Sequence, residues 1–181
     1  IGGGTSEMAV ISLGGIVASE SVRIGGVKLD AAIQDYVRRE YGLAIGDRTA
    51  EQIKIQIGSA MYLEDKMQME VKGRDLVTGL PKILTVTSDD VTDAIQHELR
   101  GIIDSVKNVL QKTPPELSAD VMDKGIVMSG GSSQLRNFHK LIADATGVPT
   151  YVADDTQLCV ARGTGIALEN LEAYKRSIFT T

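Results

Sequence analysis

Two glycine turns carry the residue types in this sequence that are best suited to binding chemistry. The first is GGGT at residues 2–5, directly before a run of β-forming residues, and the second is SGGSSQLR at residues 129–136, between an apolar strand and a helix. Glycine lets a ligand approach the backbone, and free N–H groups of a turn or a helix N-terminus bind phosphate. Each turn also has a simpler interpretation without a ligand: a flexible leader for the first, and a tight strand-to-helix connection for the second.

Other motifs with catalytic or metal-binding chemistry are missing from the sequence. The second turn is not a P-loop, because the Lys and Ser/Thr that follow GxxxxG are absent. No Cys, His and carboxylate cluster has the spacing of a transition-metal site, so we expect no metal bound by this chain. Cys159 is the single cysteine and lies among small and apolar residues, and no GxSxG is present, so a nucleophilic role is not expected.

Composition excludes several classes of partner. The 181 residues are 43% hydrophobic and 24% charged, which is typical of a globular chain. The net charge of −5 and the lack of a Lys/Arg block argue against a nucleic-acid partner. No apolar run reaches the roughly 18 residues of a membrane span, and one cysteine suits a reducing compartment. We therefore expect a cytoplasmic protein.

The elements around the first turn are predicted to be a hairpin, two helices and two more strands. The hairpin turn is expected at Gly14-Gly15, because a two-residue glycine link between β-rich runs is a strong hairpin signal. Gly42 is a candidate C-terminal residue of the first helix, and Thr49 with Gln52 fits a capping box at the start of the second. The predicted strands are 7–13, 16–24, 68–72 and 83–87, and the first helix is 28–41.

The elements around the second turn alternate between helix and strand. A long amphipathic helix begins at residue 88 and is stopped by Thr113-Pro114-Pro115, because proline cannot continue the helical ladder. A strand at 125–129, a helix at 134–147, a strand at 148–153 and a mostly helical end from 158 to about 175 follow. This alternation predicts a partly parallel sheet, which the first hairpin would complete, with residues 28–87 as an insertion.

Several stretches together resemble one known superfamily. IGGGTSEMAVISLGGIV resembles the second phosphate motif of the actin-like ATPases, GIVMSGGSSQLRNF their adenosine motif, and CVARGTGIAL their second connecting motif. DRTAEQIKIQIGSA, GRDLVTGLPK and KTPPELSADVMDKGIV are similar to the MreB family of bacterial actins. The resemblance implies an α/β fold, the actin-like ATPase domain, in which a ribonuclease H-like mixed sheet with helices carries a smaller inserted α+β subdomain. Residues 1–27 and 88–181 would form subdomain IIA, and residues 28–87 subdomain IIB.

The resemblance also implies a function for the whole protein. Members of the family bind ATP or ADP with Mg²⁺ in a cleft between two domains, of which this chain resembles the second. They polymerise into membrane-associated filaments that organise cell-wall synthesis and rod shape. The family pattern places a Mg²⁺-holding Asp directly before IGGGT and the catalytic carboxylate in the first domain. No catalytic residue is therefore assigned in this chain, and we expect it alone not to hydrolyse ATP appreciably, whereas the full-length protein would be a slow Mg-ATPase.

Ten residues are implied to bind the nucleotide. They are Gly2, Gly3, Gly4, Thr5, Glu51, Lys54, Gly130, Gly131, Ser132 and Arg136. The first four belong to the phosphate turn, Glu51 and Lys54 would flank ribose and adenine, and the last four would line the adenosine. A side chain at Gly131 is expected to fill the adenosine pocket or to strain the turn.

Two further expectations concern single positions. Gly163 and Gly165 would allow close helix packing at the hinge of the family's fold. The family more often has a third glycine where this chain has Ser132, whose Cβ and hydroxyl would either narrow the adenosine pocket or add a hydrogen bond.

Two other functions stay open on the sequence alone. One is a non-polymerising ATPase of the same superfold, such as a sugar kinase or a chaperone ATPase, because the fold does not separate these functions. The other is an interaction module that binds partners without nucleotide. Electron microscopy of the full-length protein with ATP separates filament from non-filament, and a nucleotide titration of this chain tests the interaction module.

Overall fold

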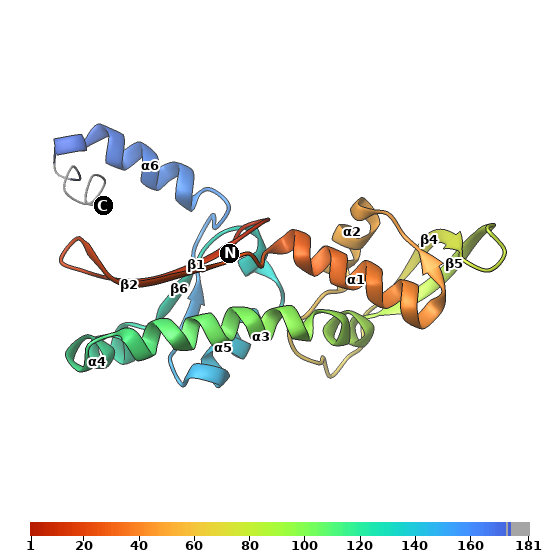
Figure 1. Cartoon of the computed structure of the whole chain (residues 1–181), viewed down its shortest axis with the longest axis horizontal. Coiled ribbons are helices and arrows are strands. Elements are labelled where there is room, and N and C mark those ends of the chain that lie inside the picture. The colour runs from red at the N-terminus through yellow and green to blue at the C-terminus, as the bar shows by residue number, and fades with distance from the viewer. Residues whose placement is uncertain (173, 175–181) are drawn as a thin grey trace.

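A long helix, α3, runs along the molecule, and the other elements are arranged around it (Figure 1). The computed structural model describes residues 1–172 and 174. The strands are β1 (Ser6–Ser12), β2 (Gly15–Val22), β3 (Leu43–Ala44), β4 (Gln68–Asp75), β5 (Pro81–Thr87), β6 (Ile126–Met128) and β7 (Thr150–Val152). The helices are α1 (Gly26–Tyr41), α2 (Asp47–Ile57), α3 (Ser88–Lys112), α4 (Pro115–Lys124), the 3₁₀ helix η1 (Gly131–Gln134), α5 (Phe138–Thr146) and α6 (Cys159–Glu169).

Helix α3 forms where the sequence repeats apolar residues every three or four positions. Val91, Ile95, Leu99 and Ile102 lie on one face and are almost completely buried. This face packs against α1 and against both strands of the first hairpin. The buried stripe therefore joins the elements that carry the first glycine turn to the rest of the core.

Helices α1 and α2 pack on one another beside α3. Gly42 ends α1 in a left-handed conformation with φ of 62°, as predicted. Helix α2 begins at Asp47 after an N-cap at Gly46 that makes no side-chain cap hydrogen bond. The predicted capping box of Thr49 and Gln52 is therefore wrong, because the helix starts before Thr49 and Thr49 lies inside its first turn.

The strands form three separate sheets. β1 and β2 pair antiparallel, β3, β4 and β5 form an antiparallel sheet in that order, and β6 and β7 pair in parallel. The parallel pairing predicted for the last third is confirmed. The prediction that the hairpin completes the same sheet is wrong, because no strand pairing joins the hairpin to β6 within the described residues. Instead β1 and β6 line a shared groove of about 710 Å³.

Some element boundaries differ from the prediction for local reasons. The hairpin turns at Leu13-Gly14, both with positive φ, and not at Gly14-Gly15. Helix α4 was not predicted, because the two prolines were interpreted only as the end of the preceding helix. Pro115 is the first residue of α4, a position that proline suits because the backbone N–H it lacks would have no partner within the helix. The helix predicted at 134–147 is shorter: η1 ends at Gln134, and α5 begins only at Phe138. The predicted helical end near residue 175 lies in part outside the described residues.

The division into two subdomains stays a prediction. The β3–β4–β5 sheet and α2 lie within the predicted insertion, 28–87, while α1 begins at Gly26. Buried residues of both predicted parts, such as Leu29 and Phe138, belong to one continuous hydrophobic cluster. No helix among residues 1–172 and 174 is both long enough and apolar enough to cross a membrane.

Candidate functional site

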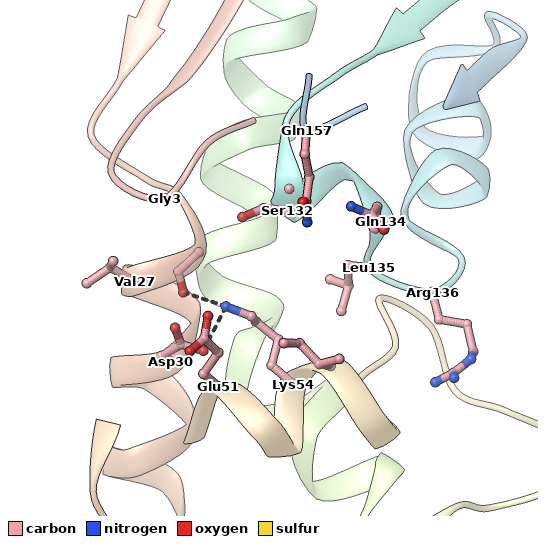
Figure 2. A pocket seen from close by; sticks show the side chains of 13 residues that line it. Gly3, Val27, Asp30, Glu51, Lys54, Ser132, Gln134, Leu135, Arg136 and Gln157 are labelled. Atoms are coloured by element: carbon pink, nitrogen blue, oxygen red, sulfur yellow. Dashed lines mark hydrogen bonds and ion pairs between the residues drawn. The ribbon is translucent and has the colours of Figure 1, made fainter. Parts of the chain in front are cut away.

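A pocket of about 530 Å³ lies where the first glycine turn, α1, α2 and the η1 turn meet (Figure 2). Six of the ten residues that the sequence implied line it: Gly3, Glu51, Lys54, Gly131, Ser132 and Arg136. The other four, Gly2, Gly4, Thr5 and Gly130, are not part of the lining. The structure thus brings together residues that lie more than 120 positions apart in the chain.

The first glycine turn is fixed by its contacts with the start of α1. The Gly26 and Val27 amides donate to the carbonyl oxygens of Gly2 and Gly3, each at 2.9 Å. These bonds satisfy amides that a helix N-terminus otherwise leaves free, so the two donors are not available to a ligand. A Cβ added at Gly3 would meet no atom within 4 Å. The exposed side of Gly3 is therefore open to close approach by a ligand.

Gly130 and Gly131 have different surroundings in the second turn. Gly130 has a φ of +89°, and a Cβ there would lie 2.3 Å from the carbonyl oxygen of Ile1. Gly131 has no positive φ, and the nearest atoms to its Cβ would belong to the Gln157 side chain at 3.8 Å or more. The strain expected for a side chain at Gly131 is therefore wrong. Strain belongs to Gly130, whereas Gly131 faces the cavity.

The sequence left two alternatives for Ser132: its side chain would narrow the adenosine pocket or add a hydrogen bond. The structure shows the added hydrogen bond. The Ser132 Oγ donates to the carbonyl oxygen of Gly2 at 2.9 Å. The Ser132 amide also donates to the carbonyl oxygen of Ile1 at 3.2 Å. The second turn is thus bonded directly to the first.

Lys54 on α2 is held against α1 by two contacts. Its Nζ lies 2.8 Å from Asp30 Oδ1 and donates to the carbonyl oxygen of Gly26 at 3.2 Å. The Lys54 and Asp30 side chains are only 13% and 16% exposed. Burial raises the pKa of the Asp30 carboxyl, and the Lys54 ammonium opposes that rise. Glu51, one helical turn before Lys54, is exposed and lines the same pocket.

Asp30 is a pocket residue that the sequence analysis missed. It lies in the second turn of α1, a helix that begins directly at a glycine pair. An acidic residue at that place is a weak signal by itself, because it also suits an ordinary solvated helix face. Its partner Lys54 becomes visible only when α1 and α2 are packed together.

Arg136 makes a contact that the sequence did not indicate, whereas Gly163 and Gly165 lack the close packing that was predicted for them. Arg136 lines the pocket, and its Nη1 donates to the carbonyl oxygen of Gly58 at 3.0 Å, which ties the second turn to the end of α2. A Cβ at Gly163 or Gly165 would meet no atom within 4 Å, and α6 has no buried residue. The predicted close packing at these glycines is therefore not found among the described residues.

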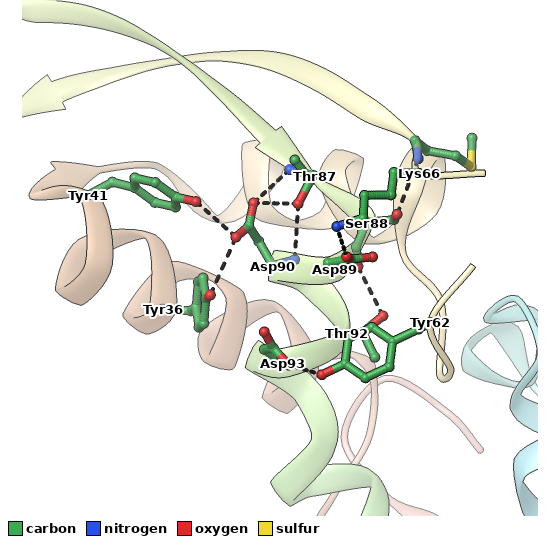
Figure 3. A network of polar contacts seen from close by, with 11 residues as sticks. Tyr36, Tyr41, Tyr62, Lys66, Thr87, Ser88, Asp89, Asp90, Thr92 and Asp93 are labelled. Carbon is green, nitrogen blue, oxygen red and sulfur yellow. Dashed lines mark hydrogen bonds and ion pairs between the residues drawn. The ribbon is translucent and has the colours of Figure 1, made fainter. Parts of the chain in front are cut away.

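A second polar cluster surrounds the start of α3 (Figure 3). Asp90 Oδ2 accepts hydrogen bonds from the Thr87 amide and hydroxyl, at 2.8 and 2.7 Å. Asp90 Oδ1 accepts from the Tyr41 hydroxyl at 2.8 Å and from the Tyr36 hydroxyl at 3.4 Å. Burial opposes ionisation of Asp90, but these hydrogen bonds lower its pKa overall. None of these residues lines the 530 Å³ pocket, so the cluster joins α3 to α1 and is not part of the candidate site.

Comparison with known proteins assigns the family. The family model described as MreB/Mbl protein matches residues 1–176. The chain belongs to the MreB/Mbl family. The cell shape-determining protein MreB of Escherichia coli strain K12 is 47% identical over 180 residues, which are 99% of this chain and 52% of that protein. The cell shape-determining protein Mbl of Bacillus subtilis strain 168 is 44% identical over 172 residues, 95% of this chain and 52% of that protein. The chain spans about half the length of these curated relatives.

Solved structures agree with this assignment. The crystal structure of MreB5 of Spiroplasma citri bound to AMPPNP has a TM-score of 0.91 and 39% identity, and the match covers 96% of this chain and 52% of that one. The same protein bound to ADP has the same score and identity, with 100% and 54% coverage. The MamK double helical filament has a TM-score of 0.71 at 20% identity, over 84% of this chain and 47% of that one, and indicates the fold alone. The predicted actin-like ATPase fold is confirmed, and with it the resemblance to the MreB family.

Proposed function

We propose that this chain forms one wall of an ATP/ADP site in an actin-like cell-shape protein. The observation that carries the proposal is the convergence of both glycine turns with Glu51 and Lys54 on one pocket. Its volume, about 530 Å³, lies within the range of small-molecule and cofactor sites. The MreB5 relative, solved with AMPPNP and with ADP, supports the same ligand class.

The residues of the pocket suit the parts of a nucleotide. The open backbone at Gly3, and at Gly4 just outside the lining, allows phosphate oxygens to reach amide groups without a side chain between them. Glu51, which is exposed, can accept hydrogen bonds from ribose hydroxyls. Gly131 leaves room beside Gln157 for a flat ring. In this proposal the chain binds and orients the nucleotide and does not itself supply a catalytic group.

We do not expect the described residues to supply a complete set of ligands for magnesium. Among the residues that the structure describes, no group of three or more His, Cys, Asp or Glu could hold a metal ion. Magnesium bound with nucleotides takes most of its ligands from phosphate oxygens and water, with one or two carboxylates. We therefore assign no residue of this chain to the metal.

Titration calorimetry with ATP and ADP tests the proposal on the 181-residue chain. We expect saturable binding of both, and Glu51→Ala should weaken it by about three- to tenfold, the scale of one hydrogen bond. Glu64→Ala is the matched control, because Glu64 is exposed and lies outside the pocket lining. The proposal fails if the folded wild-type chain binds neither nucleotide, a result that would favour an interaction module without nucleotide.

We further propose that the full-length protein is cytoplasmic and self-associates into membrane-associated filaments. These filaments would organise cell-wall synthesis and rod shape. Support comes from the relatives, which are named cell shape-determining proteins. Residues 1–27 and 88–181 would be its subdomain IIA and residues 28–87 its subdomain IIB. Electron microscopy of the full-length protein with ATP and Mg²⁺ tests the assembly; the absence of filaments would favour a non-polymerising ATPase.

A further inference from the structure

Three backbone segments meet at the inner end of the pocket. They are residues 1–3, residues 25–27 and residues 130–132. The Gly26 amide donates to the Gly2 carbonyl oxygen, and a Cβ at Gly25 would lie 2.7 Å from the carbonyl oxygens of Gly2 and Gly3. The segments therefore pack backbone against backbone, with no space for side chains at the points of closest contact.

Ser132 contributes a side-chain bond at this junction. Its hydroxyl donates to the Gly2 carbonyl oxygen at 2.9 Å, so that oxygen accepts two hydrogen bonds, one from α1 and one from the second turn. A Cβ added at Gly26 would lie 2.7 Å from Ser132 Oγ, which shows how closely the hydroxyl approaches the start of α1. The hydroxyl proton faces the first turn and is not free for donation to a ligand.

We propose that Ser132 is a positioning residue that holds the first glycine turn in place through Gly2. This inference rests on the proposed nucleotide site. It adds that Ser132 fixes the position of the turn that would bind the phosphates. The bond fixes the open backbone at Gly3 and Gly4 relative to the Gly131 wall before a ligand arrives. Binding then costs less ordering of the turn, because the turn is already in its bound position.

Ser133 provides a matched control on the same turn. It is completely buried, and its hydroxyl donates to the Gly130 carbonyl oxygen at 2.7 Å. It also lies 2.9 Å from Thr156 Oγ1. These partners belong to the second turn and the segment after β7. Removal of the Ser133 hydroxyl should therefore affect stability without releasing the first turn specifically.

Amide hydrogen exchange on the nucleotide-free chain tests the bond directly. Ser132→Ala should speed exchange of the Gly26 and Val27 amides by about three- to tenfold relative to amides of the β4–β5 pairing. Ser132→Thr, which keeps a hydroxyl, should restore most of the protection. Ser133→Ala should leave the ratio between the two groups of amides unchanged. Unchanged relative exchange at Gly26 and Val27 in Ser132→Ala would overturn the inference.

Ligand affinity gives a second and separate readout. Ser132→Ala should weaken ATP binding by about three- to tenfold and adenosine binding clearly less, because the lost bond to Gly2 acts on the phosphate turn, which adenosine does not contact. An equal loss for ATP and adenosine, or no loss for either, would contradict a positioning role. If the wild-type chain binds neither ligand, the proposed function fails, and the exchange experiment still decides whether Ser132 holds the turn.

Discussion

Gly130 and Gly131 follow one another in the second turn, but only Gly130 is expected to be indispensable for folding. Gly130→Ala places a Cβ 2.3 Å from the Ile1 carbonyl oxygen at a φ of +89°, and should destabilise the chain by about 1–3 kcal/mol. Gly131→Ala has open space and should stay within about 0.5 kcal/mol of the wild type. Urea unfolding measures both, and equal losses for the two variants would contradict the assignment.

Gly131→Val is a second single-residue test, and it concerns the pocket wall. The valine side chain should enter the cavity and weaken ATP binding by about tenfold, within the roughly 1–3 kcal/mol typical of a disturbed contact. Thermal melting of the same preparation should change little, because Gly131 has no glycine-only backbone angle. A folded Gly131→Val variant with unchanged ATP affinity would remove Gly131 from the site.

At the residue scale, the sequence could indicate which turns are tight but not which atoms approach them. Glycine at Gly130 is required by contact with residue 1, while at Gly131 the same residue type faces the cavity. That difference depends on how residue 1 packs against the second turn, 129 positions later in the chain. Asp30 was missed for the same reason, since its contact with Lys54 exists only after α1 and α2 have packed.

At the scale of elements, the start of α3 depends on one carboxylate. Asp90→Ala removes the capping box with Thr87 and the hydrogen bonds from Tyr36 and Tyr41. We expect a loss of about 1–2 kcal/mol in the free energy of unfolding, the range of a lost N-cap. Asp93→Ala, on the exposed side of the same helix, is the control; it removes only the hydrogen bond from the Tyr62 hydroxyl and should cost less. An Asp90→Ala variant as stable as the wild type would show that the cluster does not hold α3 to α1.

The tyrosines of this cluster predict a pH dependence. Burial and the nearby Asp90 raise the pKa of Tyr36 and of Tyr41 to about 12. Since the unfolded value is about 10, the stability from the neutral tyrosines is fully present below pH 10 and is lost as pH rises toward 12. Tyrosinate absorbance of the five tyrosines should show Tyr36 and Tyr41 ionising late, together with Tyr62, whose pKa is raised by its hydrogen bond to Asp93. Ionisation of all five tyrosines near pH 10 in the folded chain would refute this.

The tip of the β4–β5 hairpin should respond to acid. Hydrogen bonds from the Thr78 amide, Lys82 and the Val77 amide lower the pKa of Asp75 to about 2. The stability from this carboxylate is present above about pH 4 and is lost as pH falls toward 2. Asp75→Asn should therefore destabilise the chain at neutral pH and have a much smaller effect near pH 2. Urea unfolding at both pH values measures the difference, and an equal effect at both would contradict it.

How well an element could be predicted depended on how local its causes are. α3 and α1 were found because a buried face repeats every three or four residues, and Gly42 marks the end of α1. α4 was missed for two reasons. A proline pair can end one helix and begin the next, and α4 has no buried residue, so its sequence lacks the apolar repeat of a packed helix. The shift of the first hairpin turn to Leu13-Gly14 follows from strand register, which side-chain types at a turn do not fix alone.

At the scale of the whole molecule, this chain should bind nucleotide without turning it over. No catalytic group is assigned to its residues, and removal of one preorganised catalytic element typically costs about 10²-fold or more in rate. Phosphate release by the 181-residue chain should therefore be at least about 10²-fold slower than by the full-length protein under the same conditions. Equal rates would show that the chain carries the catalytic groups itself.

The global arrangement of the strands was the least predictable feature. The parallel β6–β7 pair could be predicted from strand–helix–strand alternation, which is a local pattern. Whether the β1–β2 hairpin pairs with β6 depends on the distance between segments separated by more than 100 residues, and the structure leaves a groove there. The resemblance to the MreB family was more informative at this scale, because it rests on several motifs in a fixed order.

The groove between β1 and β6 has a consequence for handling the isolated chain. Among the described residues each of these strands is paired along one edge only, and an unpaired edge is a template on which another chain can add a strand. Ile11 and Val127 beside these edges are each 68% exposed, which adds apolar surface to the template. We therefore expect concentrated solutions of the chain to form sheet-type aggregates, with light scattering that rises steeply with protein concentration below the melting temperature.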